Sequence, residues 1–232
     1  TDFDALRQHP NVDLIMVKPG ATLPVADLII LPGSKNVQAD LQSLRDFGWD
    51  KAIAKHLRYG GKCFGICGGL QMLGEEITDP HSIESNLASS TALSYLPIKT
   101  QLQESKQLRN IKGQLHWGVA VQGYEIHCGT SQRTGGEAFA LLSDGREDGA
   151  ISADDLVAGS YLHGLFDHPT AANAILNWAG LAADTTVDLN QKREQQLERL
   201  ADCVEEHFDS AFLNNLNQSS AKSSVKSKVM PC

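Results

Sequence analysis

Short apolar runs bounded by proline and glycine open the chain. They cover residues 12–17 (VDLIMV), 28–31 (LIIL) and, after Gly60 and Gly61, 62–66 (KCFGI). Continuous apolar runs of this length are typical of strands buried in a parallel sheet. Between the second and third runs, apolar positions at helical spacing predict helix over 36–59 with a break near Gly48. With the short helical run 70–73, this order indicates a doubly wound α/β fold.

The pattern changes over residues 90–162, which are rich in Gly, Thr and Ser. Alternating runs at 118–126 and 138–142 predict antiparallel strands joined by long loops, and 156–162 predicts a further strand. Helical spacing returns at 170–179 and stops at Gly180, a residue suited to the end of a helix. We therefore expect a mostly parallel sheet flanked by helices, with an antiparallel excursion in the middle.

A last long helix is predicted from Asp188, a plausible N-cap with Gln191 three residues later. Its apolar residues fall on one stripe: Leu197, Leu200, Ala201, Val204, Phe208, Ala211 and Phe212. Beyond Leu216 the chain is polar and of low complexity, which predicts disorder. The expected organisation is one domain over 1–216 and a disordered tail over 217–232.

Composition excludes several classes of partner. The 232 residues carry a formal net charge of −8 and no basic block that could follow a phosphate backbone, so nucleic acid and anionic membranes are poor partners. No apolar run approaches the roughly 18 residues of a membrane-spanning helix, and the first residues (TDFDALRQHP) do not resemble a secretory signal. A cytoplasmic location is the resulting expectation.

The five cysteines form an odd set without the paired spacing of a metal site, so we expect thiols and no bound metal. Cys63, Cys128 and Cys203 fit small buried apolar residues. Cys67 differs because it lies in Gly65-Ile66-Cys67-Gly68-Gly69, between a predicted strand and a predicted helix.

The segment 65–69 has the form of a nucleophile elbow, in which a reactive residue sits on a strained strand-to-helix turn. Its outer positions leave no room for Cβ atoms, and the helix N-terminus favours the thiolate. An inert glycine-rich turn remains open. A phosphate-binding loop would need Lys and Ser or Thr after the glycines, where this chain has Leu70 and Gln71.

A second glycine turn, 31–34 (LPGS), follows the preceding predicted strand. In a parallel sheet the carboxyl ends of neighbouring strands meet at one edge, so this turn would lie beside Cys67. The backbone N–H groups of Gly33 and Gly68 could then form an oxyanion hole, although Pro-Gly is also common in plain turns.

Cysteine acyl chemistry also needs a base. Of eight histidines, His163 is best placed, because it follows the predicted strand 156–162 and precedes Gly164, in a loop rather than a helix. His127 is a second plausible site residue.

Five blocks of sequence resemble those of the class I, or triad, glutamine amidotransferases, and more narrowly the C-terminal glutaminase domain of the cobyric acid synthase family. The blocks follow the family's order across most of the chain: residues 31–36 (LPGSKN), 65–74 (GICGGLQMLG), 77–80 (ITDP), 123–129 (GYEIHCG) and 159–167 (GSYLHGLFD).

The resemblance implies a flavodoxin-like sheet and glutamine as substrate. It implies that Cys67 forms a glutamyl thioester and that His163 moves the protons. Ammonia would pass to an ATP-dependent synthetase that amidates corrin carboxylates, so ATP and Mg²⁺ are expected only in that partner and no cofactor in this chain. Our candidates for holding glutamine are Gln71, Tyr124, Glu125 and His127.

The chain departs from the family in several places. Many triad enzymes carry Glu two residues after the His, where this chain has Leu165; that branch of the family generally lacks this Glu, and Asp167 is a possible substitute. Ser82 and Ser85 stand where glycines are usual and would restrict a loop near the site. No P-loop is present, and the first strand would precede Thr1, so we expect a piece of a longer protein.

Other functions remain open at this point. The chain could be the glutaminase part of cobyrinic acid a,c-diamide synthase or of the lipid II amidating enzyme. It could also be a non-catalytic module that binds a synthetase without turnover. A hydrolase or redox sensor built on the same elbow would lack selectivity for glutamine.

Overall fold

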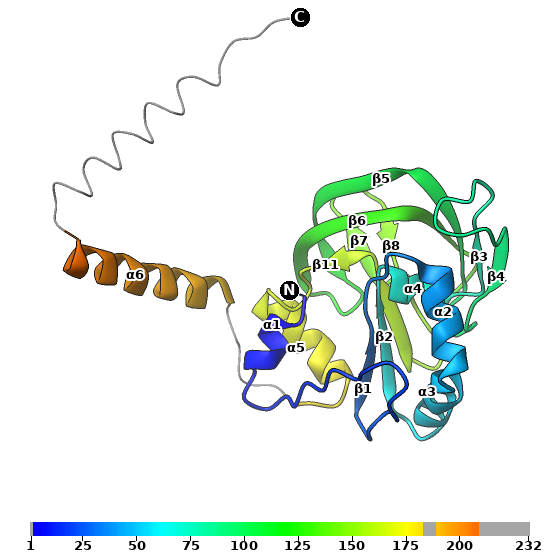
Figure 1. Cartoon of the computed structure of the whole chain (residues 1–232), viewed down its shortest axis with the longest axis horizontal. Helices are drawn as coiled ribbons and strands as arrows, with labels where there is room; N and C mark the ends of the chain where they lie inside the picture. The colour runs from blue at the N-terminus through cyan, green and yellow to red at the C-terminus, as the bar shows by residue number, and fades with distance from the viewer. Residues whose placement is uncertain (1, 183–188, 209–232) are drawn as a thin grey trace, which may run out of the picture. The chain divides into compact units, whose positions relative to one another are not determined.

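The computed structural model describes residues 2–182 and 189–208 (Figure 1). The chain divides into two compact units, Thr1–Val187 and Asp188–Cys232. The first unit contains both sheets and all the candidate site residues.

A four-stranded sheet forms the α/β part of the first unit, in the order β1-β2-β10-β9. Three of its strands run parallel and β9 runs antiparallel. Their bounds are β1 Leu28–Leu31, β2 Lys62–Ile66, β9 Ala150–Ile151 and β10 Val157–Ser160. The predicted strands 28–31 and 62–66 are confirmed, and the register that pairs Leu31 with Gly65 brings the two carboxyl ends to one edge.

The predicted strand over 12–17 is wrong. These residues form neither strand nor helix, and Ile15 and Met16 are 52% and 61% exposed. A strand needs a hydrogen-bonded neighbour as well as an apolar sequence. Within residues 2–182, β1 is the end strand of its sheet and pairs only with β2, so this apolar run does not pair with the outer edge of β1.

Helices flank this sheet (Figure 1). Their bounds are α1 Asp4–Gln8, α2 Val37–Asp46, α3 Trp49–Arg58, α4 Gly68–Leu73 and α5 Pro169–Trp178. The predicted break at Gly48 is confirmed, since this residue adopts a φ of 70° between α2 and α3. Asn36 caps α2 by accepting a hydrogen bond from the N–H of Ala39 at 3.1 Å.

The core of the α/β part is apolar and aromatic. Phe64, at the centre of β2, is fully buried, and its ring lies 5.1 Å from that of Phe139 and 6.4 Å from that of Trp178. The side chains of Leu70 and Leu73 on α4 are fully buried. The buried strand β2 and the short helix α4 therefore form a rigid support for the turn between them.

A second sheet contains the antiparallel excursion predicted for 90–162. Its strands follow the order β11-β6-β5-β3-β4, with β7 and β8 added beside β5. Their bounds are β3 Glu76–Thr78, β4 Ser89–Thr91, β5 Ile98–Leu115, β6 Ala120–Arg133, β7 Ala140–Leu142, β8 Glu147–Asp148 and β11 Leu162–His163. The long ribbon of β5 and β6 curves over the molecule (Figure 1).

The second unit contains the helix α6, Leu189–His207. On this helix the side chains of Leu197 and Leu200 are 58% and 60% exposed, and Cys203 is exposed, so the expectation of a buried Cys203 is wrong. The N-cap Asp188, the stripe residues Ala211 and Phe212, and the tail 217–232 lie outside the described residues. Among the residues described, none of the helices is both long and apolar enough to cross a membrane.

Candidate active site

The turn between β2 and α4 places Cys67 in a strained conformation. Cys67 has a φ of 52° and a ψ of −106°, a positive φ that non-glycine residues rarely adopt. A Cβ on Gly65 would lie 2.6 Å from the backbone of Gly69, and a Cβ on Gly69 would overlap the carbonyl oxygen of Leu31. Both outer glycines are required by close packing, as expected for a nucleophile elbow.

The turn after β1 lies beside this elbow. A Cβ on Gly33 would be 3.8 Å from the Cβ of Cys67 and 3.6 Å from Cε1 of His163. A Cβ on Gly68 would be 2.7 Å from the backbone N of Ser34. Gly33, in the turn after β1, and Gly68, the first residue of α4, thus both lie beside Cys67, and their role as an oxyanion hole stays a prediction.

His163 reaches the same place from the second sheet. It is the last residue of β11, rather than part of a loop as expected, and it pairs with Tyr124 on β6. The ring of Tyr124 stacks on the imidazole at a centroid distance of 5.2 Å and an interplanar angle of 13°. Nε2 of His163 is buried and has no hydrogen-bond partner among the described residues.

The other imidazole nitrogen is held by a carboxylate that the sequence motifs do not reveal. Nδ1 of His163 lies 2.8 Å from Oδ2 of Asp2, and the N–H of Gly164 donates to Oδ1 of Asp2 at 3.1 Å. The sequence pattern had suggested Asp167 for this position. Asp2 precedes His163 by 161 residues and belongs to no motif, so nothing local in the sequence identifies it.

These contacts shift the pKa values of His163 and Asp2. Burial alone would lower the pKa of His163, but the hydrogen bond and charge of Asp2, together with the neighbouring Cys67, outweigh it and raise the pKa to about 9. Burial would raise the pKa of Asp2, yet the hydrogen bond and charge of His163 hold it below its usual value. The same contacts therefore stabilise the imidazolium that His163 becomes when it takes the thiol proton, with Asp2 as its counter-ion.

The Cys67 thiol also touches the second sheet. Its Sγ lies 3.6 Å from the carbonyl oxygen of Ile126 on β6, a distance at which the S–H donates to that oxygen. Cys63, in contrast, is fully buried on β2, and burial raises its pKa to about 12. Its burial agrees with the expectation of an inert cysteine, whereas Cys128 is only partly buried.

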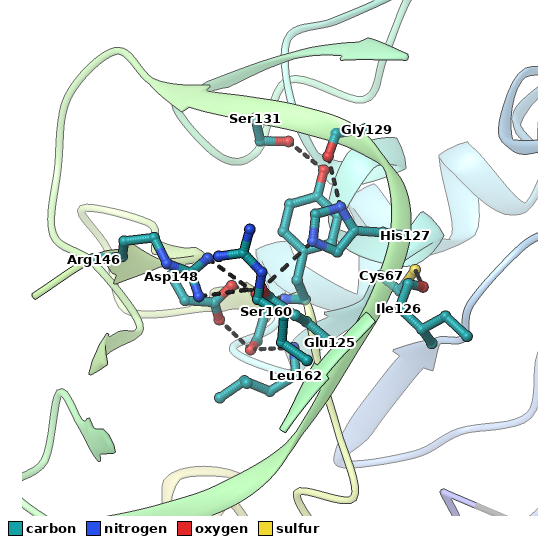
Figure 2. Close-up of polar contacts among 12 residues, drawn as sticks. Cys67, Glu125, Ile126, His127, Gly129, Ser131, Arg146, Asp148, Ser160 and Leu162 are labelled. Carbon is teal, nitrogen blue, oxygen red and sulfur yellow. Dashed lines mark hydrogen bonds and ion pairs between the residues drawn. The ribbon is translucent and has the colours of Figure 1, made fainter. Parts of the chain in front are cut away.

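Three of the four candidate substrate residues make buried polar contacts, and those of Glu125 and His127 are drawn in Figure 2. Gln71 donates to the hydroxyl of Tyr161 at 3.0 Å, and that hydroxyl also lies 2.6 Å from Oγ of Ser131. The ring of His127 stacks on Tyr161 at 3.9 Å, and Nδ1 of His127 lies 2.6 Å from the carbonyl oxygen of Gly129. Burial lowers the pKa of His127, so its ring is neutral at neutral pH.

Glu125 lies in the same region with its side chain 3% exposed. Oε2 of its carboxylate accepts a hydrogen bond from Nη1 of Arg146 at 3.2 Å, and Oε1 lies 3.1 Å from Nη2 of Arg146 as an ion pair only. This ion pair offsets part of the cost of burying the carboxylate charge. Gln71, Glu125 and His127 therefore support the strands around the site, and Tyr124 alone of the four stacks on His163; glutamine contact by any of them stays a prediction.

The serine-containing loop adjoins the site. Ser82 adopts a φ of 52°, the conformation for which glycine is usual, and the Asp79 carboxylate accepts hydrogen bonds from three successive N–H groups, those of residues 83–85. The carbonyl oxygen of Glu84 accepts from the Asn36 side chain at 2.9 Å. The loop is thus tied to the segment that follows Gly33. Among the residues that the structure describes, no group of His, Cys, Asp and Glu could hold a metal ion.

Comparisons with known proteins agree with this geometry. Residues 1–171 match the model of the CobB/CobQ-like glutamine amidotransferase domain. A crystal structure of a glutamine amidotransferase aligns with a TM-score of 0.59 at 19% identity, covering 77% of this chain and 92% of that one. PurLQS from Thermotoga maritima aligns with a TM-score of 0.57 at 15% identity, covering 76% of this chain and 90% of that one.

A putative GMP synthase component from Thermoplasma acidophilum aligns with a TM-score of 0.50 at 15% identity, covering 84% of this chain and 89% of that one. At such identities the alignments establish the fold, which confirms the expected α/β architecture with its helix-flanked parallel sheet. The family match covers well over half of the residues. The chain belongs to the family of CobB/CobQ-like glutamine amidotransferase domains.

Proposed function

We propose that the chain hydrolyses glutamine through Cys67 and His163 and supplies the ammonia to an ATP-dependent synthetase. The observation that carries the proposal is the meeting of a strained cysteine with a buried, carboxylate-bound imidazole: Cys67 at φ 52° and His163 with an unpartnered Nε2 within the described part of the chain. Nucleophile, base and orienting group in this arrangement are the requirements of acyl transfer by cysteine.

The chemistry follows from the positions of these groups. Sγ of Cys67 attacks the γ-carbonyl carbon of glutamine, and the thiol proton passes to Nε2 of His163. The tetrahedral oxyanion faces the N–H groups of Gly33 and Gly68. His163 then donates its proton to the leaving amine, so that the C–N bond breaks, ammonia departs and a glutamyl thioester remains.

Water completes the cycle. His163, again unprotonated at Nε2, takes a proton from water while the oxygen attacks the thioester carbon. Collapse of the second tetrahedral intermediate breaks the C–S bond, and the returning proton regenerates the Cys67 thiol with release of glutamate. Asp2 keeps its negative charge throughout. Thiol chemistry of this kind suits a reducing compartment, and we place it in the cytoplasm.

For the acceptor we propose the carboxylates of a corrin ring, specifically adenosylcobyrinic acid a,c-diamide on its way to cobyric acid. The support is the family match over residues 1–171 together with the sequence blocks that resemble the cobyric acid synthase branch. In this proposal ATP and Mg²⁺ belong to the synthetase, which activates each carboxylate before ammonia attacks it.

The test of the chemistry uses two cysteines of different exposure. A glutamine-analogue diazoketone should label Cys67 and spare the exposed Cys203, whereas iodoacetamide should modify Cys203. Cys67→Ala and Cys67→Ser should abolish glutaminase activity, and Cys203→Ser should leave it unchanged. Activity is measured with the synthetase present, and turnover by Cys67→Ala would contradict the mechanism.

Labelling and turnover together also separate the competing functions. A protein that binds glutamine, by calorimetry of Cys67→Ala, but neither reacts with the diazoketone nor turns over is a non-catalytic module. The acceptor is tested by glutamine-dependent amidation with three synthetases in parallel, those for cobyric acid, cobyrinic acid a,c-diamide and lipid II. Amidation with either of the last two and none with the first would overturn the proposed acceptor.

A further inference from the structure

Both carboxylate oxygens of Asp2 make contacts with the segment that carries His163. One carboxylate oxygen lies 2.8 Å from Nδ1 of His163, and the other accepts from the N–H of Gly164 at 3.1 Å. The Asp2 side chain is 19% exposed and that of His163 is 11% exposed, so water competes weakly for this bond. The backbone of Gly164, at φ 76°, presents its N–H on the same side as the imidazole.

The segment that carries Asp2 is anchored by its own packing. Phe3 lies against Phe166 at a ring distance of 6.4 Å, and Ala5 and Leu6 of α1 are 4% and 3% exposed. Burial of these side chains holds the segment independently of the ion pair. Asp2 is therefore fixed at His163 by the fold around it as well as by its charge.

At the position where many triad enzymes carry a carboxylate, this chain has none. That position, two residues after the histidine, holds Leu165, which is 1% exposed. An imidazole that must hold its Nε2 free for a thiol proton needs its Nδ1–H bound to an acceptor, because this bond sets the tautomer and the ring orientation.

We propose that Asp2 is the positioning residue that fixes the tautomer and orientation of His163 and stabilises its imidazolium between attack on glutamine and departure of ammonia. The inference rests on the proposed glutaminase function for its kinetic part. The raised pKa of His163, about 9, is consistent with it, since Asp2 contributes both a hydrogen bond and a charge.

The titratable groups around His163 are Asp2, Cys67, the stacked Tyr124 and, through its charge, His127. Asp2 and Cys67 both raise the pKa of His163, so the Cys67→Ala background isolates the contribution of Asp2. In that background the Asp2→Asn change should lower the pKa of His163 to below its usual value, because the burial that lowers it remains. The titration is followed by NMR of the ring nitrogens and protons in the full chain, which also reports the tautomer.

The kinetic arm uses protein with an intact Cys67 and its synthetase. Asp2→Asn should lower kcat by on the order of 10²- to 10⁴-fold, by analogy with removal of the triad carboxylate in serine proteases, with KM changed by less than about threefold. Asp2→Glu keeps the charge and should recover part of kcat. Asp4→Asn is the matched control, since Asp4 lies two residues away with its side chain 43% exposed and should show the activity of the unsubstituted protein.

The NMR titration and the kinetic experiment test different parts of the proposal, and each can fail without the other. An unchanged pKa of His163 in the Asp2→Asn protein would overturn the positioning role, and so would a loss of kcat as large in Asp4→Asn as in Asp2→Asn. If Asp2→Asn does not fold, the pKa of His163 in the Asp2→Glu protein decides, because a carboxylate at this position must keep it raised. Absence of glutamine turnover in the unsubstituted chain with its synthetase, alongside the expected pKa change, would overturn the proposed function and leave the ion pair intact.

Discussion

A Glu at position 165, where many triad enzymes carry one, should destabilise this protein. Leu165→Glu removes a side chain that is 1% exposed, which costs about 2 kcal/mol of apolar burial. The new carboxyl takes the place of this buried side chain, and a buried Glu reaches a pKa of about 8 against about 4.3 in the unfolded chain. At pH 7 keeping it neutral costs about 3 to 4 kcal/mol, since each pKa unit is about 1.4 kcal/mol.

The total of about 5 to 6 kcal/mol approaches the whole stability of a small domain. It should also depend on pH in a defined direction. A carboxyl whose folded pKa lies above its unfolded value loses stability as pH rises between the two, so at pH 5 the electrostatic cost falls to about 1 kcal/mol. Urea unfolding of Leu165→Glu at pH 5 and pH 7 should therefore differ by about 2 to 3 kcal/mol more than that of the unsubstituted protein.

Leu165→Gln is the matched control, because it has the same shape and no titration; its deficit should be the same at both pH values. If Leu165→Glu were as stable as the unsubstituted protein at pH 7, the side chain would have found solvent or a cation. The double variant that combines Leu165→Glu with Asp2→Asn tests whether the new carboxylate has found a cation, namely His163. Recovery of glutaminase activity in that double variant would show that a carboxylate at 165 can replace Asp2 at His163.

Three further substitutions test the elbow and its surroundings by urea unfolding. Gly69→Ala should cost about 3 kcal/mol because its Cβ would overlap the carbonyl oxygen of Leu31, whereas Gly135→Ala, with open space around it, should cost little; equal costs would contradict the packing argument. Burial raises the pKa of Asp148 from 3.8 to about 6, so ionisation of this group opposes folding as pH rises through that window. Asp148→Asn should then gain about 2 to 3 kcal/mol relative to the unsubstituted protein between pH 4 and pH 7, and a constant difference would refute the burial effect. Ser82→Gly should stabilise the fold by about 0.5 to 1 kcal/mol by relieving a φ of 52°, and Ser82→Ala should give no such gain; a gain from both would point to the lost hydroxyl instead.

Local patterns were sufficient to predict the part of the site that depends on local geometry. Residues 62–66 form the buried strand and Gly65 and Gly69 are close-packed, because a strand, a tight turn and a helix follow one another within twelve residues. The neighbouring strand 28–31 was equally predictable from its apolar run. Parallel pairing then placed Gly33 beside Cys67 without any further information.

The failures involve contacts that no local pattern specifies. Residues 12–17 are apolar enough for a strand, but membership of a sheet depends on a neighbour elsewhere in the chain. Asp2 meets His163 across 161 residues, and an acidic residue near the start of the chain has no periodicity or motif to distinguish it. Cys203 was expected to be buried because cysteines usually are, yet a helix position can be exposed whatever its residue type.

The geometry of the site depends on one short connection between the two sheets. Ser160 pairs with Ile66 at the end of β10 and its carbonyl oxygen accepts from the N–H of Cys67 at 2.9 Å, while His163, three residues later, pairs with Tyr124 on β6. The span from Ser160 to His163 therefore sets the separation of nucleophile and base. A shift of one residue in either ladder would turn the imidazole to the opposite face of its strand.

Buried polar groups form hydrogen bonds along this connection, from Ser160 to Leu162. The Ser160 hydroxyl donates to Asp148 at 2.5 Å and accepts from the N–H of Leu162 at 2.9 Å, and the Tyr161 hydroxyl bonds both Gln71 and Ser131. A shift of one residue would break each of these bonds as well as the apolar contacts of the buried faces. Burying a carboxyl and two hydroxyls costs stability, and at this junction it fixes the one alignment in which His163 faces Cys67.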